Sequence, residues 1–91
     1  MNTVKATSIF KALSDRTRID VLKIIHRKGE ISCQDLSKSF DLSQPALSHH
    51  FSKLIKAEVI LARKVGAAHF YKLNAPLFRQ LGINMNAVFK N

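Results

Sequence analysis

Two neighbouring segments of this chain have the pattern of short helices joined by a tight turn. The first covers residues 31–36 and the second covers residues 42–54. Ser43 is a candidate N-cap for the second helix, because its hydroxyl can accept a backbone N–H that the first turn leaves unpaired. Pro45 falls in that first turn, where a missing N–H costs little. The two segments together predict a helix-turn-helix.

The second of these helices has two chemically different faces. The 100° step between helical residues places Leu47, Phe51 and Leu54 together on an inner face. The outer face carries Pro45, Ser48, His49, Ser52 and Lys56. No acidic residue lies between positions 42 and 57, so positive potential is not cancelled locally. Such a helix is suited to the major groove of DNA, with the preceding helix supporting it.

Length and charge narrow the class of protein. The 91 residues are enough for one domain with a single core, covering positions 1–91. Fifteen Lys and Arg against six Asp and Glu leave a net charge of +9, which points to nucleic acid or an anionic membrane surface as partner. One cysteine allows no internal disulfide, and we find no apolar leader or membrane-spanning run. We therefore expect a cytoplasmic protein without a membrane association.

The remaining pattern predicts a helical domain with one hairpin. Helices are expected at about 3–13 and 16–28, capped by Asp15 and Gly29, and a short third helix is expected from a Ser32 cap to about residue 40. The β-prone runs 59–65 and 69–73 flank Gly66 and predict a hairpin. A last helix is expected to begin at Pro76, with a possible break near Gly82. The predicted fold is a winged helix-turn-helix, in the order of four helices, two strands and a helix.

Both terminal helices carry more apolar surface than so small a core can cover. A two-fold interface, in which the first and last helices of two chains pack together, is a natural use for this surface. The candidate interface residues are Val4, Ile9, Phe10, Leu77, Phe78, Leu81, Met85 and Val88.

Several ordered motifs resemble the ArsR/SmtB family of winged-helix repressors. They lie at residues 12–18, 31–36, 42–50 and 66–73, and the resemblance covers about residues 5–75. The resemblance implies a cytoplasmic homodimer that binds double-stranded DNA at an imperfect palindrome and releases it when a signal binds. The sequence does not identify that inducer, the operator or the regulated genes.

The resemblance also assigns roles to residues. It implies that Gln44, Ser48 and His49 reach base edges, and the amide of Gln44 suits bidentate pairing with adenine. Pro45 cannot donate the hydrogen bond that a small polar residue often makes there, so an apolar contact replaces it. Contacts to the DNA backbone, from this helix or from the wing, are expected from Ser43, Ser52, Lys53, Lys56, Arg63, Lys64 and His69.

The metal sites known in this family lack their ligands here. One such site uses a Cys-x-Cys pair on the third helix, where this chain has Ser32 and Gln34 around Cys33. Another uses Asp, His and Glu on the last helix, but neither an acid nor a histidine follows His69. We therefore expect no regulatory metal and no cofactor.

Some single residues have two readings. Cys33 is either a redox sensor, activated by a helix N-terminus, or a small buried apolar residue. His49 and His50 point about 100° apart on a helix, so they do not form a metal pair; His50 is expected to be partly packed. Either Phe70 or Tyr71 should face the core.

Arg16 and Arg18 remain open between two roles, contacting phosphate or pairing with nearby acids. Enzymatic activity finds no support in a catalytic triad, a carboxylate pair or a glycine-rich phosphate loop. Two other functions remain as alternatives: a winged helix that binds an acidic protein, and a nucleic-acid binder without sequence preference.

Overall fold

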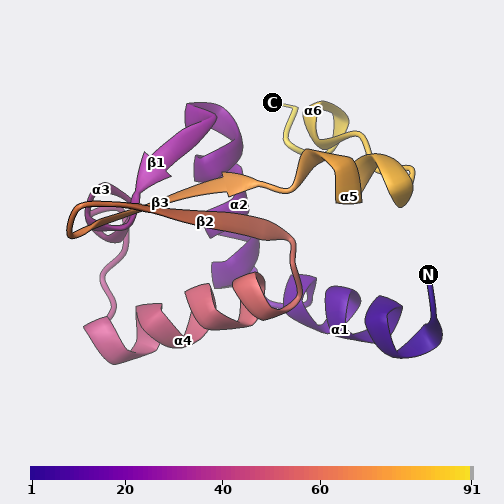
Figure 1. Cartoon of the computed structure of the whole chain (residues 1–91), viewed down its shortest axis with the longest axis horizontal. Coiled ribbons are helices and arrows are strands. Elements are labelled where there is room, and N and C mark those ends of the chain that lie inside the picture. Colours follow the sequence, from indigo (N-terminus) through magenta and orange to yellow (C-terminus); the bar gives the residue numbers. More distant parts are fainter. Residues whose placement is uncertain (91) are drawn as a thin grey trace.

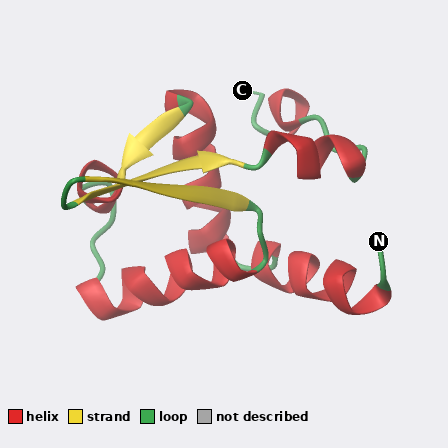
Figure 2. Cartoon of the chain, in the orientation of Figure 1, coloured by secondary structure: helices red, strands yellow, loops and turns green. Residues whose placement is uncertain are grey.

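The fold is a helical domain with a small sheet on one side (Figure 1, Figure 2). The computed structural model describes residues 1–90. In chain order the elements are α1 (Thr3–Leu13), α2 (Arg16–Lys28), β1 (Glu30–Ser32), α3 (Cys33–Ser37), α4 (Gln44–Lys56), β2 (Ile60–Val65), β3 (Ala68–Leu73), α5 (Ala75–Gln80) and α6 (Met85–Val88). The helix-turn-helix is formed by α3 and α4, and the wing by β2 and β3.

Short-range hydrogen bonds set the starts of the central helices where the sequence predicts them. The Asp15 carboxylate accepts the Arg18 N–H at 3.0 Å at the start of α2. The Ser32 hydroxyl accepts the Asp35 N–H at 3.1 Å before α3, and the Ser43 hydroxyl accepts the Ala46 N–H at 3.2 Å before α4. These caps satisfy N–H groups that have no partner within the helix, and the predicted caps are confirmed.

The sheet has one strand that the sequence analysis missed. Its order is β1-β3-β2, with both pairs antiparallel. The predicted hairpin is confirmed, and Gly66 adopts a φ of 60° at its tip, a conformation that glycine adopts without strain. β1 lies across β3, with Ile31 opposite Tyr71. Three residues are too few to show an alternating pattern, and the partner strand is about forty residues away.

The last helical segment is divided into two pieces. Gly82 has a φ of 72°, and the Ile83 N–H donates to the Phe78 carbonyl at 2.9 Å, which ends α5. The Asn84 side chain then accepts from the Asn86 and Ala87 N–H groups and starts α6. The expected break near Gly82 is therefore present, and the single last helix is corrected to two.

The core uses part of the surface that was assigned to a dimer interface. Ile9, Leu77 and Phe78 are 0%, 4% and 2% exposed, within the main apolar cluster. These three residues pack inside one chain, so their assignment to the interface is corrected. Val4, Phe10 and Val88 remain 80%, 54% and 55% exposed. The terminal elements therefore keep a smaller apolar surface than the sequence suggested.

Candidate nucleic-acid interface

The outer face of α4 presents polar side chains that the protein itself does not use. Gln44, Ser48 and His49 are all exposed. Within residues 1–90, the side chains of Gln44 and Ser48 make no hydrogen bond to the protein. On the opposite face Leu47, Phe51 and Leu54 are buried, as predicted. The donors and acceptors of this outer face are therefore free for groups outside the chain.

Two contacts hold α4 at a defined position. The ring of Phe51 lies 5.3 Å from the ring of Tyr71 on β3, which joins the helix to the sheet (ring centroids). On the other side, the His50 ring nitrogen Nδ1 lies 3.7 Å from Asp15 and 3.4 Å from the Arg18 guanidinium. The half-buried position expected for His50 is confirmed. These contacts orient the outer face relative to the rest of the domain.

Arg18 has a structural role that neither alternative from the sequence described. Its guanidinium donates to the carbonyl of Ala12 at 2.7 Å and to that of Lys11 at 3.2 Å. These carbonyls lie at the C-terminal end of α1, where a cation is favourable. Arg18 therefore fastens α1 to α2 rather than pairing mainly with an acid. No sequence signal indicated this role, because the interacting groups are backbone atoms.

The charge of Asp15 is stabilised where it meets α2 and α4. The Arg18 backbone N–H that it accepts is the main cause that lowers the pKa of Asp15, and the charges of Arg18 and His50 add to this effect. The cap is therefore ionised at neutral pH. Its charge supports both the start of α2 and the contact with His50.

The two faces of the wing carry different basic side chains. Residues directly opposite one another in antiparallel strands share a face, and side chains alternate along each strand. Lys64 lies opposite His69, and both share their face with Tyr71, which packs on α4. Arg63 lies opposite Phe70 on the other face. Both Lys64 and His69 are exposed, so the wing extends the basic surface of α4 with these two side chains.

Arg63 is held by the protein. Its guanidinium donates two hydrogen bonds to the Glu30 carboxylate, at 2.8 and 2.7 Å, and lies 5.1 Å from the centre of the Phe70 ring. These bonds lower the pKa of Glu30 and raise the pKa of Arg63. Glu30 was missed by the sequence analysis because its partner is 33 residues away. Phe70, whose ring lies beside Arg63, is only half-buried, whereas the next residue, Tyr71, is buried and faces the core.

A basic groove runs between α1 and α4. It has a volume of about 710 Å³, and its lining includes Lys11, Arg18, Lys53 and Lys56. Lys53 and Lys56 are exposed, as expected for backbone contacts, whereas Ser52 is half-buried. The Ser43 hydroxyl accepts the Ala46 N–H, which leaves its own O–H available as a donor. Lys11 adds a cation to this surface that the sequence analysis did not single out.

The Cys33 thiol is half-buried beside the buried Tyr71. Burial, with the neighbouring thiol of Cys33, raises the pKa of the Tyr71 hydroxyl.

No group of three or more His, Cys, Asp and Glu side chains close enough to hold a metal ion occurs within residues 1–90. In the same part of the chain, no helix has the length and apolar character needed to cross a membrane.

Comparison with known proteins supports the same reading of the fold and the helix-turn-helix. A family model described as a helix-turn-helix domain matches residues 13–62. The arsenical resistance operon repressor of Staphylococcus aureus is 35% identical over 97% of this chain and 84% of its own length. The transcriptional repressor SdpR of Bacillus subtilis is 35% identical over 79% of each chain.

Solved structures show the same architecture. The crystal structure of an ArsR family transcriptional regulator superposes with a TM-score of 0.81 at 27% identity, covering 90% of this chain and 84% of that chain. HlyU from Vibrio cholerae superposes with a TM-score of 0.79 at 27% identity, covering 99% and 97% of the two chains. The winged fold, the exposed face of α4 and these relatives agree, and the chain belongs to the ArsR/SmtB family of DNA-binding transcriptional regulators.

Proposed function

We propose that the chain is a cytoplasmic homodimeric repressor that binds a palindromic operator in a sequence-specific manner. The outer face of α4 is the observation that carries this proposal. It combines exposed amide, hydroxyl and imidazole groups with the absence of acids between residues 42 and 57. A protein that binds DNA by charge alone needs only cations on that face. The role proposed is binding, and catalysis has no part in it.

The proposed contacts divide into two classes. Gln44, Ser48 and His49 read base edges in the major groove, because their donors and acceptors are exposed. Contacts to phosphate and sugar set the affinity and the register of the protein on DNA. These come from Ser43, Ser52, Lys53, Lys56, Lys64 and His69. Arg63, included among these contacts on sequence grounds, is left out because Glu30 holds it on the other face of the wing.

The proposed dimer uses the side of the molecule opposite the wing tip. Figure 1 shows the N-terminal end of α1 and the pair α5–α6 on the same side, away from the tip of the hairpin. Val4, Phe10 and Val88 remain exposed on these elements, whereas Leu81 and Met85 are half-buried. A two-fold axis near this surface would present two copies of α4 to successive major grooves, about 34 Å apart.

Selection from a randomised duplex pool at about 150 mM salt tests the sequence preference, because phosphate binding is weakened there. We expect an enriched inverted repeat whose half-sites lie one helical turn apart. Binding without enrichment would show a charge-driven nucleic-acid binder instead. A pool that fails to bind at all would point to an acidic protein partner.

Sedimentation velocity tests the dimer separately. Phe10→Glu places a charge on the exposed face of α1 and should yield monomers at a concentration where the unchanged chain is dimeric. Leu61→Glu is a matched control, because Leu61 is also exposed but lies on β2. Equal effects of the two substitutions, or a dimer that survives Phe10→Glu, would contradict the proposed interface.

A further inference from the structure

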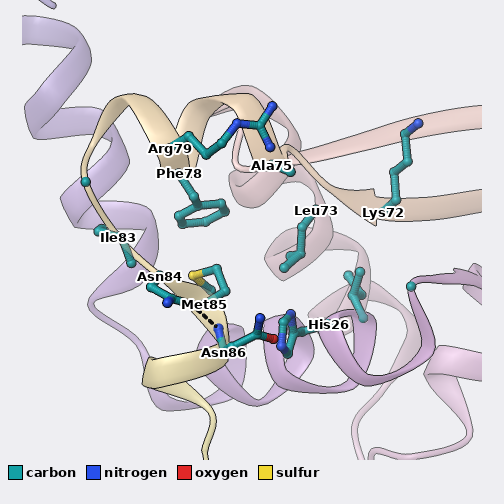
Figure 3. A pocket seen from close by; sticks show the side chains of 13 residues that line it. His26, Lys72, Leu73, Ala75, Phe78, Arg79, Ile83, Asn84, Met85 and Asn86 are labelled. Carbon is teal, nitrogen blue, oxygen red and sulfur yellow. Dashed lines mark hydrogen bonds between the residues drawn. The ribbon is translucent and has the colours of Figure 1, made fainter.

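A second hollow lies away from the DNA-facing surface, between the C-terminal end of α2, the end of β3 and the segment α5–α6. Its volume is about 780 Å³, within the range of pockets that hold small molecules. Figure 3 shows Phe78, Leu73 and Met85 directed toward its middle. Ile25, Ala75 and Ile83 add to its apolar lining. None of these residues belongs to the contacts proposed for DNA.

The rim of this pocket is cationic and polar. Arg79 and Lys72 lie at its edge, with their charged ends directed away from its middle, and His26 lies beside Asn86 on the opposite side (Figure 3). Both Arg79 and Lys72 are exposed, and neither forms a salt bridge within residues 1–90. The described lining contains no acidic side chain.

One acid that lies near Lys72 is already engaged. Glu30 lies opposite Lys72 in the strand pairing, and the charge of Lys72 helps to lower the pKa of Glu30. However, both oxygens of this carboxylate accept hydrogen bonds from Arg63. The charge of Arg79 is opposed by no acid in the described lining. The rim therefore attracts an anion, while the interior excludes a small inorganic one by its apolar lining.

From this combination we propose that the pocket binds a small amphipathic anion, namely a carboxylate with an apolar chain or ring. The carboxylate lies at the rim against the Arg79 guanidinium, which can form two parallel hydrogen bonds to it. The apolar part lies against the half-buried Leu73, Ile83 and Met85, above the buried Phe78, and gains affinity by leaving water. This site is independent of the proposed DNA contacts, although its part on α5–α6 adjoins the surface proposed for the dimer, and its test requires no DNA.

Titration of the full chain with sodium octanoate, followed by amide NMR spectra, tests the proposal. Octanoate supplies one carboxylate and an apolar chain short enough for the pocket. We expect saturable shifts centred on the amides of Gly29, Gly82 and Asn86, which line the pocket. Octylammonium, which has the same chain with the opposite charge, should bind at least about tenfold more weakly, because the rim repels it.

A pair of double variants separates the rim from overall charge. Lys72→Gln/Arg79→Gln removes two cations of the rim and should weaken octanoate binding about tenfold or more. Arg16→Gln/Lys38→Gln removes the same two charges from exposed positions outside the pocket and should leave binding unchanged. Circular dichroism spectra of each variant check that it is folded. The comparison of octanoate with octylammonium uses the unchanged chain, so it holds even if a variant unfolds.

Three results would overturn the proposal. The first is equal binding of octanoate and octylammonium, which would show an apolar site without charge selection. The second is shifts centred on Val4 and Phe10, which would place octanoate on the exposed face of α1. The third is shifts at the pocket that follow protein concentration and not octanoate, which would show that a second copy of the chain covers the pocket.

Discussion

Neighbouring cations on the wing should contribute unequally to DNA binding, although the sequence presents them alike. Lys64 shares its face of the wing with Tyr71, on the side that packs against α4. Arg63 is on the opposite face and donates two hydrogen bonds to Glu30. We therefore expect Lys64→Gln to remove one phosphate contact in each protomer, and Arg63→Gln to remove none.

The size of the effect follows from counterion release. Each phosphate contact contributes about 0.9 to the slope of log K against log salt concentration, so two contacts in a dimer contribute about 1.8. When the salt concentration rises from about 50 to about 150 mM, the fold-loss of DNA affinity should be about seven times larger for the unchanged protein than for Lys64→Gln. Arg63→Gln should keep the original slope. Fluorescence anisotropy with a labelled operator duplex, repeated over this salt range, measures both slopes.

A third variant accounts for the carboxylate that Arg63→Gln leaves unpaired. Glu30→Gln/Arg63→Gln removes both partners, so any loss of DNA affinity that an unpaired Glu30 causes should disappear in this variant. Equal changes of slope in Lys64→Gln and Arg63→Gln would refute the reasoning from the strand register. A larger change in Arg63→Gln would show that the ion pair opens when DNA binds.

Three further predictions concern α4 and its supports. Gln44→Ala should reduce base discrimination by about 1–3 kcal/mol at one position in each half-site. Binding to operator variants with single-base changes measures this discrimination. A uniform loss of affinity over all sequences would instead assign Gln44 to contacts with the DNA backbone. Leu54→Ala should reduce the free energy of unfolding in urea by about 2–5 kcal/mol, because Leu54 is 0% exposed; a loss below about 1 kcal/mol would contradict tight packing there. Asp15→Asn keeps a capping oxygen but removes a charge whose pKa is lowered in the folded chain. The unchanged chain should therefore be more stable than Asp15→Asn above the ordinary pKa of 3.8, and this advantage should disappear as the pH falls through the lowered value. Urea unfolding of both proteins at pH 7 and at about pH 3 measures the difference in stability. A difference that does not change with pH would contradict the assignment.

The caps and faces of the helices were predictable because their causes are local. Asp15, Ser32 and Ser43 each bond an N–H three residues further along the chain. The inner face of α4 follows from the helical period alone, and the predicted residues are buried. The motifs of the helix-turn-helix lie in the same short segments. The fold class and the DNA-binding family could therefore be inferred from the sequence.

The pairings that define the interface in detail were beyond the sequence. β1 is a strand only because it pairs with β3, and three residues carry no pattern of their own. Glu30 and Arg63, 33 residues apart, meet across the sheet, and this contact separates the roles of two adjacent cations. Ile9, Leu77 and Phe78 were assigned to a partner chain, but they fill the core of their own.

The sequence by itself determined the helices up to α4, the turn of the wing and the polar outer face of α4. These features depend on hydrogen bonds and periodicities that span a few residues. Only the tertiary structure decided which basic side chains are free, which apolar ones remain exposed and where a pocket forms. Those properties depend on strand register and on packing between segments far apart in the chain, and one residue of register moves a side chain to the other face of the sheet.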